Sequence, residues 1–285
     1  MEVVTTPAEL RRRTAAWRRQ GHRVGLVPTM GAIHAGHLSL CDRARAGCTR
    51  VVASIFINPL QFGTGEDLER YPRDPVADQE RLRDAGVDCC FLPEPRAMYP
   101  RGFATRVSVE RGTERWEGAV RPGHFAGVAT VVAKLFVATG PCWAYFGDKD
   151  AQQAQMVARL AHDLDTGIRV VVCPTVREPD GLALSSRNRY LDPESRQAAP
   201  CLAQGLRAAV AAFAAGTRGA AALAEHVAAP VRDQPLAELE YAAIVHPRTF
   251  APLRRADARS RALVAASIRG VRLLDTIILG APAGL

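Results

Sequence analysis

Two histidines stand near two glycines in the segment VPTMGAIHAGHLSL, residues 27–40 of this 285-residue chain. A short apolar run leads into the segment, and a helical pattern begins near residue 37. Gly31 and Gly36 allow the backbone to come close to a ligand, and the first N–H groups of a helix point outward without partners. We therefore predict a donor-rich pocket that suits a phosphate chain, with His34 and His37 facing one point.

A simpler explanation exists, because two histidines in a loop are most often surface groups or hydrogen-bonding groups of the core. The surrounding strand, glycine loop and helix favour a ligand site instead. HxGH in the first turn of a Rossmann-like sheet is typical of nucleotidyltransferases and class I aminoacyl-tRNA synthetases. In adenylyl transfer, charge grows on the phosphate oxygens and on the departing pyrophosphate, and fixed donors and cations lower the barrier without a protein nucleophile. We expect the loop to bind ATP for this purpose.

The segment YFGDKDAQQ, residues 145–153, is typical of a strand end, a Gly turn and a helix start. It places Lys149 and Asp150 at the carboxyl edge of a parallel sheet, where ligands collect. Lys134 and Lys149 are the only lysines among 37 basic residues, so the ammonium retained at Lys149 indicates a point charge for phosphate. Asp150 could hold Mg²⁺, although Asp148 and Asp150 could instead cap the helix.

A third segment, GLALSSRNRYL at residues 181–191, offers two hydroxyls and a guanidinium. Ser185, Ser186 and Arg187 would contact the β- and γ-phosphates, and the stretch resembles the mobile KMSKS-type loop of the same enzymes. Ser-Ser-Arg alone is too common to identify a site. It supports a nucleotide site only together with the other two segments.

A fourth segment, SIFINPLQFG at residues 54–63, ends a buried apolar run with amide side chains. Asn58 and Gln61 would be exposed at the same edge of the sheet, where neutral amides can orient a small polar substrate without adding charge. A plain turn explains Asn58 and the proline after it equally well. It explains less of the sequence around Gln61.

Strands and helices alternate in the first two-thirds of the chain. Predicted strands cover residues 24–27, 51–57, 87–92, 143–146 and 169–173, and predicted helices cover 38–48, 75–84, 122–137 and 151–162. This alternation indicates an α/β fold with a Rossmann-like parallel sheet covered by helices on both faces. Further on, helices at 192–215 and 219–232 precede strands at 239–245, 263–268 and 271–279. We therefore predict a Rossmann-like ligand-binding domain at 1–176 and a smaller C-terminal α+β domain at 177–285, which would serve as a lid.

The composition disfavours several classes of protein. With 48% hydrophobic and 23% charged residues, the chain is typical of a globular protein. No apolar run approaches the ~18 residues of a membrane span, and the Arg-rich N-terminus lacks the apolar core of a secretory signal. Seven cysteines without a CxxC pair indicate neither a disulfide framework nor a zinc site, which fits the cytoplasm. The net charge of +8 is spread along the chain, so we expect small anionic ligands rather than nucleic acid.

The four segments, in this order, resemble the pantothenate synthetase (pantoate–β-alanine ligase) family. Three further stretches are similar to the same family: DLERYPRD at 67–74, RPGHFAGVATVVAKLF at 121–136 and IVHPRTFAPL at 244–253. Seven co-linear motifs make the resemblance specific, although any one could arise by chance. The resemblance implies that ATP and (R)-pantoate give pantoyl adenylate and pyrophosphate. The amine of β-alanine then gives pantothenate, the coenzyme A precursor, and AMP.

The resemblance also implies roles for individual residues. The ATP site would comprise Met30, Gly31, Ala32, Ile33, His34, Ala35, Gly36, His37, Gly147, Asp148, Lys149, Asp150, Val176, Leu184, Ser185, Ser186 and Arg187. Of these, the catalytic residues would be His34, His37, Lys149 and Arg187. Gln61 and Gln153 would hold pantoate beside Asn58, and Gln61 would also serve β-alanine. A homodimer is implied as well.

His37 is the residue to which the family assigns proton donation. Pyrophosphate leaves readily and hardly needs a proton, so we expect both histidines to act mainly as hydrogen-bond donors to phosphate oxygens. Two departures from the family pattern are small. The chain has GDKD at 147–150 where GEKD is usual, which leaves Lys149 in place. It has His246-Pro247 where an acid is usual, which puts in doubt only contacts from the C-terminal domain.

Three alternatives remain open. Another adenylyl or cytidylyl transferase would share the HxGH loop but would need extra cations for a phosphorylated acceptor, and the amides of Gln61 and Gln153 suit a neutral hydroxy-acid tail better. A class I synthetase would need a tRNA-binding domain, for which the stretch after Arg187, without a basic patch, is a poor candidate. A nucleotide-binding module without turnover is disfavoured because all four candidate catalytic residues are present.

Overall fold

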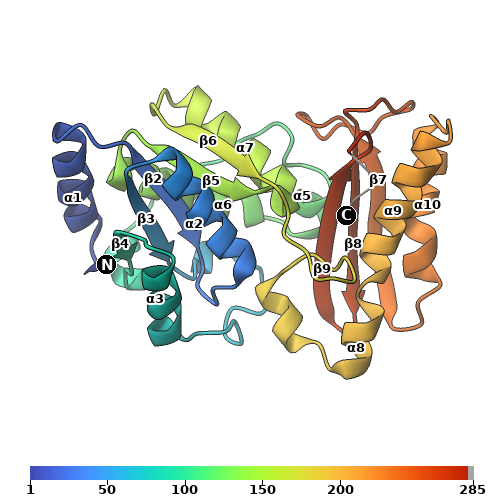
Figure 1. Ribbon diagram of the computed structural model, residues 1–285, viewed down its shortest axis with the longest axis horizontal. Coiled ribbons are helices and arrows are strands. Elements are labelled where there is room, and N and C mark those ends of the chain that lie inside the picture. Colours follow the sequence, from blue (N-terminus) through green and yellow to red (C-terminus); the bar gives the residue numbers. More distant parts are fainter. Residues whose placement is uncertain (282–285) are drawn as a thin grey trace. The chain divides into compact units, whose positions relative to one another are not determined.

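Six parallel strands form the larger of two sheets (Figure 1). The computed structural model describes residues 1–281. The strands are β1 (Glu2–Val4), β2 (Val24–Thr29), β3 (Arg50–Ile55), β4 (Cys89–Phe91), β5 (Trp143–Gly147) and β6 (Arg169–Cys173), in the spatial order β1-β4-β3-β2-β5-β6. Their short β-branched and apolar runs suit a sheet that is buried on both faces.

Helices cover both faces of this sheet. The helices α2 (Ala35–Gly47) and α3 (Pro75–Asp84) contribute to one apolar core, and α1 (Pro7–Arg19), α6 (His124–Thr139) and α7 (Ala151–Asp163) contribute to another. The two cores are separate because neighbouring strand residues such as Leu26 and Val27 point to opposite faces. Figure 1 shows α2 and α3 in front of the strands.

Local capping signals fix where several helices begin. Thr6 and Glu9 form a capping box at the start of α1, in which each side chain accepts the other's backbone N–H. Asp74 caps α3 in front of Pro75, whose fixed φ suits a first helical position. These signals are local in sequence, which explains why the predicted bounds of α3 agree with the observed ones.

The strand order reverses between β2 and β5. Leu26 of β2 lies opposite Val52 of β3 on one side and Ala144 of β5 on the other. Ligands of parallel sheets bind beyond the carboxyl ends of the strands at such a reversal. The chain leaves β2 at Thr29 and leaves β5 at Gly147, directly before two of the segments predicted to bind a nucleotide.

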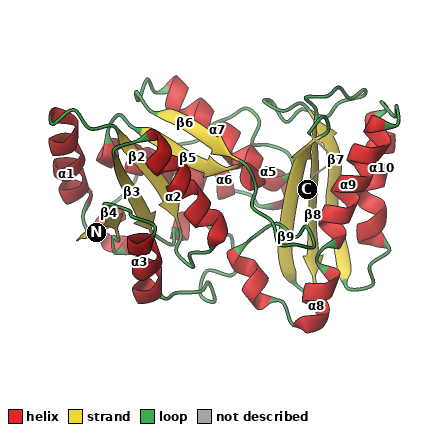
Figure 2. Ribbon diagram, in the orientation of Figure 1, coloured by secondary structure: helices red, strands yellow, loops and turns green. Residues whose placement is uncertain are grey.

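Three antiparallel strands form the second sheet. They are β7 (Ala237–Val245), β8 (Arg261–Ile268) and β9 (Val271–Ile278), in that spatial order. Arg269 and Gly270, both with positive φ, make the two-residue turn between β8 and β9. Figure 2 shows α9 (Cys201–Ala214) and α10 (Ala220–Arg232) on one side of this sheet, and they share its apolar core.

The chain divides into two compact units. The first comprises Met1–Gly147 and Gln152–Pro174, and the second comprises Asp148–Ala151 and Thr175–Leu285. The turn Asp148–Ala151 therefore belongs with the second unit, although the predicted boundary followed residue 176. Within residues 1–281, no helix has both the length and the apolar character that crossing a membrane requires.

The predicted fold class is confirmed by both sheets and their helices. One predicted helix, 192–215, is wrong in detail, because α8 (Pro193–Ala198) ends before Pro200 and α9 begins after it. Pro200 has no N–H to donate to a carbonyl of the preceding turn, so it cannot make the hydrogen bond that would continue α8 into α9. Single turns and short elements were not predicted: β1, α4 (Pro95–Met98), α5 (Glu117–Val120), η1 (Pro59–Gln61), η2 (Asp148–Asp150) and η3 (Ser186–Tyr190).

Candidate active site

A buried carboxylate of α3 holds the loop that follows β2. The N–H groups of Ala32 and Ile33 each donate to Asp78 at 2.7 Å, one to each carboxylate oxygen. Asp78 is only 2% exposed. Gly31 and Ala32 have φ angles of 83° and 50°, in the left-handed region, where successive N–H groups can converge on an anion. Asp78 was not predicted as a site residue, because its only signal in the sequence is an acid among the apolar positions of a helix.

His34 begins α2 by capping it. Its Nδ1 accepts a hydrogen bond from the N–H of Gly36 at 3.1 Å, so a neutral ring carries its proton on Nε2. The rings of His34 and His37 stack with their centroids 4.0 Å apart. The structure thus brings the two half-buried imidazoles together, and α2 begins at Ala35, two residues before its predicted start.

Fewer backbone N–H groups face a ligand than predicted. Those of Ala32 and Ile33 donate to Asp78, and that of Gly36 donates to His34. The predicted donors were the first N–H groups of a helix that begins near residue 37. Those of His37 and Leu38 donate to the His34 carbonyl at 2.9 and 3.1 Å, so the prediction that they point at a ligand is wrong. Acceptors within the protein already occupy them.

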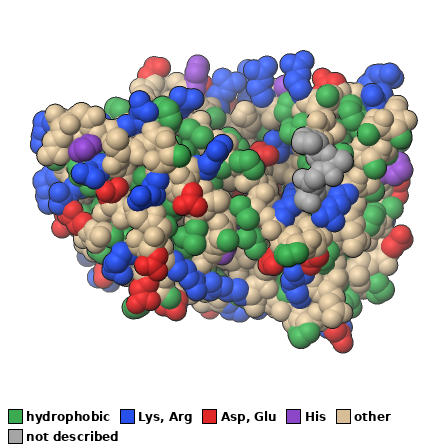
Figure 3. Space-filling view, viewed as in Figure 1, with side chains coloured by type: hydrophobic (Ala, Val, Ile, Leu, Met, Phe, Trp, Pro, Cys, Tyr) green, Lys and Arg blue, Asp and Glu red, His purple; other side chains and the backbone are tan. Residues whose placement is uncertain are grey.

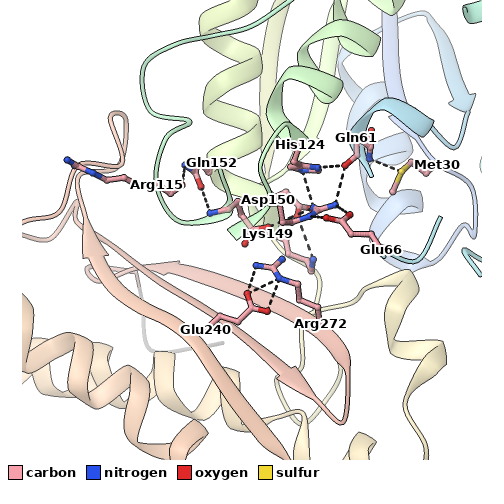
Figure 4. A network of polar contacts seen from close by, with 12 residues as sticks. Met30, Gln61, Glu66, Arg115, His124, Lys149, Asp150, Gln152, Glu240 and Arg272 are labelled. Carbon is pink, nitrogen blue, oxygen red and sulfur yellow. Dashed lines mark hydrogen bonds and ion pairs between the residues drawn. The ribbon is translucent and has the colours of Figure 1, made fainter. Parts of the chain in front are cut away.

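Gln61 of η1 lies against Met30 of the loop that follows β2. Its Nε2 donates to Met30 Sδ at 2.9 Å, and its Oε1 accepts from Asn58 Nδ2 at 3.1 Å. Figure 4 shows His124 and Met30 on opposite sides of Gln61. Two residues predicted from different motifs are thus neighbours in the first unit.

Asn58 and Gln61 are both buried, at 1% and 9% exposure, so the prediction that their amides are exposed at the sheet edge is wrong. The Oδ1 of Asn58 accepts from the Tyr99 hydroxyl at 2.7 Å and from the Leu60 N–H at 3.3 Å. Its Nδ2 also donates to the Gly127 carbonyl at 3.1 Å. Protein groups therefore take up the hydrogen bonds of the Asn58 amide, and one of these groups is the Gln61 side chain.

The RPGHFAG segment holds the main chain of Gln61. His124 Nδ1 donates to the Gln61 carbonyl at 2.9 Å, and Arg121 Nη2 donates to it at 3.4 Å. Arg121 also forms a bidentate pair with Glu66, at 2.8 Å from Nε to Oε1 and 2.5 Å from Nη2 to Oε2. The family resemblance singled out this segment, but only the structure shows what it supports.

Burial and the charge of Arg121 govern the protonation of the cluster formed by Glu66, Arg121 and His124. Burial, together with the positive charge of Arg121, lowers the pKa of His124 to about 4. Burial alone would raise the pKa of Glu66, but hydrogen bonds and charge from Arg121 bring that pKa below its ordinary value. At neutral pH the cluster therefore holds a neutral imidazole beside a closed Glu–Arg ion pair.

Two adjacent glutamines at the start of α7 differ in their surroundings. Gln152 is 5% exposed and donates from Nε2 to the carbonyls of Gly112 and Arg115, at 2.8 and 3.0 Å, which ties down the loop before α5. Gln153 is half-buried, and its amide makes no hydrogen bond within the part of the chain that the structure describes. The Gln153 side chain can therefore serve a ligand.

In the second unit, Asp148 anchors the turn that carries Lys149. Arg261 of β8 binds the Asp148 carboxylate through both Nη atoms, at 2.8 and 3.0 Å. Lys149 Nζ lies 3.8 Å from Asp150 Oδ1, and the two side chains are 18% and 47% exposed. Arg261 was not predicted as a site residue, although an arginine in the apolar strand RALVAASI is a usable signal.

The Ser185–Arg187 segment is braced against the strands of the second unit. The Leu184 N–H donates to the Val176 carbonyl at 3.0 Å, which closes a hairpin ahead of η3. Arg177, next to Val176, pairs with Asp275 of β9 at 2.5 and 2.9 Å. The three residues predicted to bind phosphate therefore follow a hairpin that is fixed to the sheet of their own unit.

Charge is scattered over the surface. Figure 3 shows Lys and Arg side chains interspersed with acidic ones on the visible face. Among residues 1–281, no group of three or more His, Cys, Asp or Glu is arranged to hold a metal ion. A metal at this site would take most of its ligands from substrate phosphates and water, as Mg²⁺ commonly does.

Comparison with known proteins agrees with these features. The model of the pantoate-beta-alanine ligase family matches residues 2–278. Pantothenate synthetase of Thermus thermophilus is 52% identical over 97% of this chain and 99% of that protein, and that of Rubrobacter xylanophilus is 48% identical over 97% and 98%. A crystal structure of the T. thermophilus enzyme matches with a TM-score of 0.93 at 50% identity, covering 98% of this chain and 99% of that one.

A more distant solved structure gives the same result. The pantoate-beta-alanine ligase from Francisella tularensis, complexed with beta-gamma ATP and beta-alanine, matches with a TM-score of 0.80 at 30% identity over the full length of both chains. Sequence, fold and the arrangement of motifs therefore agree over the whole described chain. This chain belongs to the pantoate–β-alanine ligase family.

Proposed function

We propose that this ligase adenylates pantoate with the loop Met30–His37 and with Gly147–Asp150 and Leu184–Arg187. The observation that supports this most is the strand order, because the loop and the Gly147 turn follow neighbouring strands, β2 and β5, at the reversal point. Val176, hydrogen-bonded to Leu184, would lie near the adenine or ribose. The F. tularensis relative complexed with beta-gamma ATP supports ATP as the nucleotide.

Two bond-forming steps make up the reaction. A carboxylate oxygen of pantoate attacks the α-phosphorus of ATP, and pyrophosphate leaves with the electrons of the broken P–O bond. The amine of β-alanine then attacks the acyl carbon of the adenylate, loses a proton, and AMP leaves. Neither step forms a bond to the protein, so the enzyme acts by positioning and by stabilising charge.

Positive charge and hydrogen-bond donors would meet the phosphate oxygens. His34 caps α2 through Nδ1, so its Nε2–H is the atom that can donate to a phosphate. His37, stacked on His34, would donate in the same way. Lys149 and Arg187 would neutralise the phosphates, with the hydroxyls of the two serines beside Arg187 as further donors.

Gln61 and Gln153 would hold pantoate through neutral amides, and Gln61 would also contact β-alanine. The Gln61 side chain is fixed by Met30 and Asn58, which supports a role in orienting a substrate. Asn58 itself would act only through Gln61. Amides suit the uncharged hydroxyl end of pantoate because they add no competing charge beside the reacting carboxylate.

Mg²⁺ fits Asp150. The Asp150 side chain is 47% exposed and carries one carboxylate beside the Lys149 ammonium. Mg²⁺ is commonly held by one or two carboxylates together with phosphate oxygens and water. When bound, it would neutralise charge on the phosphates of ATP.

The remaining features of the proposal depend on the family. We infer a homodimer, as the family resemblance implies, and a cytoplasmic location, which the seven cysteines without a CxxC pair support. We also infer that the second unit acts as a lid, since a mixed anhydride must be kept from water until β-alanine arrives.

A lysine comparison tests the assignment of the phosphate site. Lys149→Arg keeps the charge but replaces a compact ammonium with a planar guanidinium, and we expect kcat for pantothenate formation to fall at least ~10-fold. Lys149→Ala should lose ~10²–10³ in kcat. Lys134→Arg is the matched control, because Lys134 lies over the Tyr99 and Phe103 rings, where arginine serves as well. Unchanged activity of Lys149→Ala would refute the assignment.

Pyrophosphate release separates this function from a related transferase. We expect release from ATP to require pantoate and not to respond to phosphorylated acceptors. A phosphorylated acceptor that replaces pantoate would instead favour a nucleotidyltransferase of another specificity.

A further inference from the structure

The N–H groups of the Gly31–Ile33 turn donate to a side chain of the protein itself, the carboxylate of Asp78. Two successive N–H groups in a left-handed turn form a concavity that commonly binds an anion such as phosphate. Here the Asp78 carboxylate occupies that concavity, with one oxygen on each N–H at 2.7 Å. The carboxylate is buried and comes from α3, a separate helix packed on this face of the sheet.

We propose that Asp78 is a positioning residue of the adenylation site, acting as a resident anion that closes the turn to phosphate and sets the place of His34. This inference rests on the proposed assignment of the loop Met30–His37 to ATP. Ile33, whose N–H is bound by Asp78, directly precedes His34, the residue that caps α2. A shift of the turn would therefore shift the imidazole that we assign to phosphate.

The surroundings of the turn show that it is built around this carboxylate. A Cβ at Gly31 would lie 2.8 Å from Asp78 Oδ2 and 3.1 Å from Ile55 Cγ2, so no side chain fits there. Ala32 takes a positive φ of 50°, which an alanine does not adopt without compensation. Two charge-assisted hydrogen bonds from a buried carboxylate supply that compensation.

Arg81, one turn further along α3, fixes the other side of the same residue. Its Nη1 donates to the Ile33 carbonyl at 2.7 Å and lies 4.0 Å from Asp78 Oδ1. The Ile33 main chain is thus held at its N–H by Asp78 and at its carbonyl by Arg81. The helix α3 therefore acts as a clamp on the turn, and Asp78 is its buried part.

Asp78→Asn tests the proposal, because the amide keeps the shape of the side chain but offers only one acceptor. Its NH2 group would face a backbone N–H, so the turn must move. We expect kcat/KM for ATP to fall at least ~30-fold, since a misplacement of about 1 Å can cost ~10² in rate. The KM for β-alanine should stay within about twofold of the wild type, a separation that general destabilisation would not produce.

Asp74→Asn is the matched control. Asp74 lies on the same helix terminus and caps α3 through the Ala77 N–H, a role that asparagine fulfils equally well. It removes the same charge from the same helix without touching the loop, and its ATP kinetics should match the wild type. Equal losses in both variants would overturn the proposal in favour of a general effect of charge on α3.

Hydrogen exchange in the wild type provides a test that does not depend on the variant folding. The amides of Ala32 and Ile33 should exchange slowly without nucleotide and should keep that protection when α,β-methylene-ATP is added. Fast exchange without nucleotide, or wild-type ATP kinetics in Asp78→Asn, would overturn the proposal. If His34→Ala also leaves the ATP kinetics unchanged, the assignment of the loop to ATP is overturned as well. If only Asp78→Asn has wild-type ATP kinetics, the positioning role of Asp78 is overturned and the assignment of the loop stands.

Discussion

Gln61 shows how one side chain is fixed by residues from distant parts of the chain. Asn58 and Met30 hold its amide, and His124 and Arg121 hold its carbonyl. Asn58 and His124 are buried, as Gln61 itself is, whereas Met30 and Arg121 are partly exposed. The specificity that we propose for pantoate therefore depends on residues that fix the position of Gln61, among them Met30 of the loop proposed to bind ATP.

His124 makes this support sensitive to acid. The unfolded chain, with an ordinary histidine pKa of 6.5, binds a proton that the folded chain does not bind until about pH 4. The stabilisation from a neutral His124 is therefore complete above pH 6.5 and is lost as the pH falls toward 4, with a limit of roughly 3 kcal/mol. Urea unfolding at a series of pH values should show this slope in the wild type.

His124→Gln should remove that part of the slope, because glutamine does not titrate. His226→Gln, at an exposed histidine of α10, is the control and should leave the slope unchanged. Identical pH dependence in the wild type and in His124→Gln would contradict a buried neutral imidazole at this position.

At the scale of elements, two pairs of helical segments approach each other through a glycine. A Cβ at Gly127 of α6 would lie 2.1 Å from the Leu60 carbonyl oxygen of η1. A Cβ at Gly205 of α9 would lie equally close, 2.1 Å, to the Val227 carbonyl oxygen of α10. The same packing device thus occurs once beside Gln61 and once in the core of the second unit.

Gly127→Ala and Gly205→Ala separate packing from function. Both substitutions force a backbone to shift, and each should destabilise the protein by about 1–3 kcal/mol. Only Gly127→Ala should raise the KM for pantoate, since it displaces the turn that carries Gln61. Thermal unfolding and steady-state kinetics on both variants check this, and a raised pantoate KM in Gly205→Ala would argue against a local effect.

Element boundaries were predictable where a cap or a proline marks them. The helix at 75–84 follows an Asp cap and a proline and has the predicted bounds. The helix predicted over 192–215 was wrong because Ala-rich periodicity continues across Pro200, whose missing N–H separates α8 from α9. Single turns such as η1 are too short to show a period, so they could not be predicted.

At the scale of the whole molecule, each unit has its own apolar core, and the chain passes from one unit to the other more than once. After β5 it enters the second unit for Asp148–Ala151, returns to the first at Gln152, and leaves again after Pro174. This short segment, Asp148–Ala151, contains Lys149. Within the second unit, Arg261 binds the carboxylate of Asp148, the residue before Lys149.

Arg261→Met should make the segment Asp148–Ala151 more mobile. Arg261 is 7% exposed, so methionine can fill its place in the strand, but the Asp148 carboxylate loses both hydrogen bonds. We expect kcat to fall about 10-fold, because Lys149 is adjacent to the freed residue. Arg259→Met, at an exposed position before the same strand, should keep wild-type activity. Wild-type kinetics in Arg261→Met would show that Lys149 is positioned by other contacts.

The sequence by itself determined the family, the two-part architecture and the residue types of the loop between β2 and α2. These follow from co-linear motifs, from strand and helix periodicity, and from caps, all of which act over a few neighbouring residues. Both the fold class and the ligase activity inferred in this way are confirmed.

Only the tertiary structure decided which polar groups are already used within the protein. Asp78 lies 46 positions from Ala32 and Arg261 lies 113 positions from Asp148, yet each pair is hydrogen-bonded. Asn58, an apparent substrate ligand in sequence, proved to be buried and bonded to Gly127, 69 positions away. Such contacts depend on strand order and helix packing, so no local sequence pattern predicts them. Burying a polar group without a partner costs free energy, which explains why these groups nevertheless pair with one another in the folded chain.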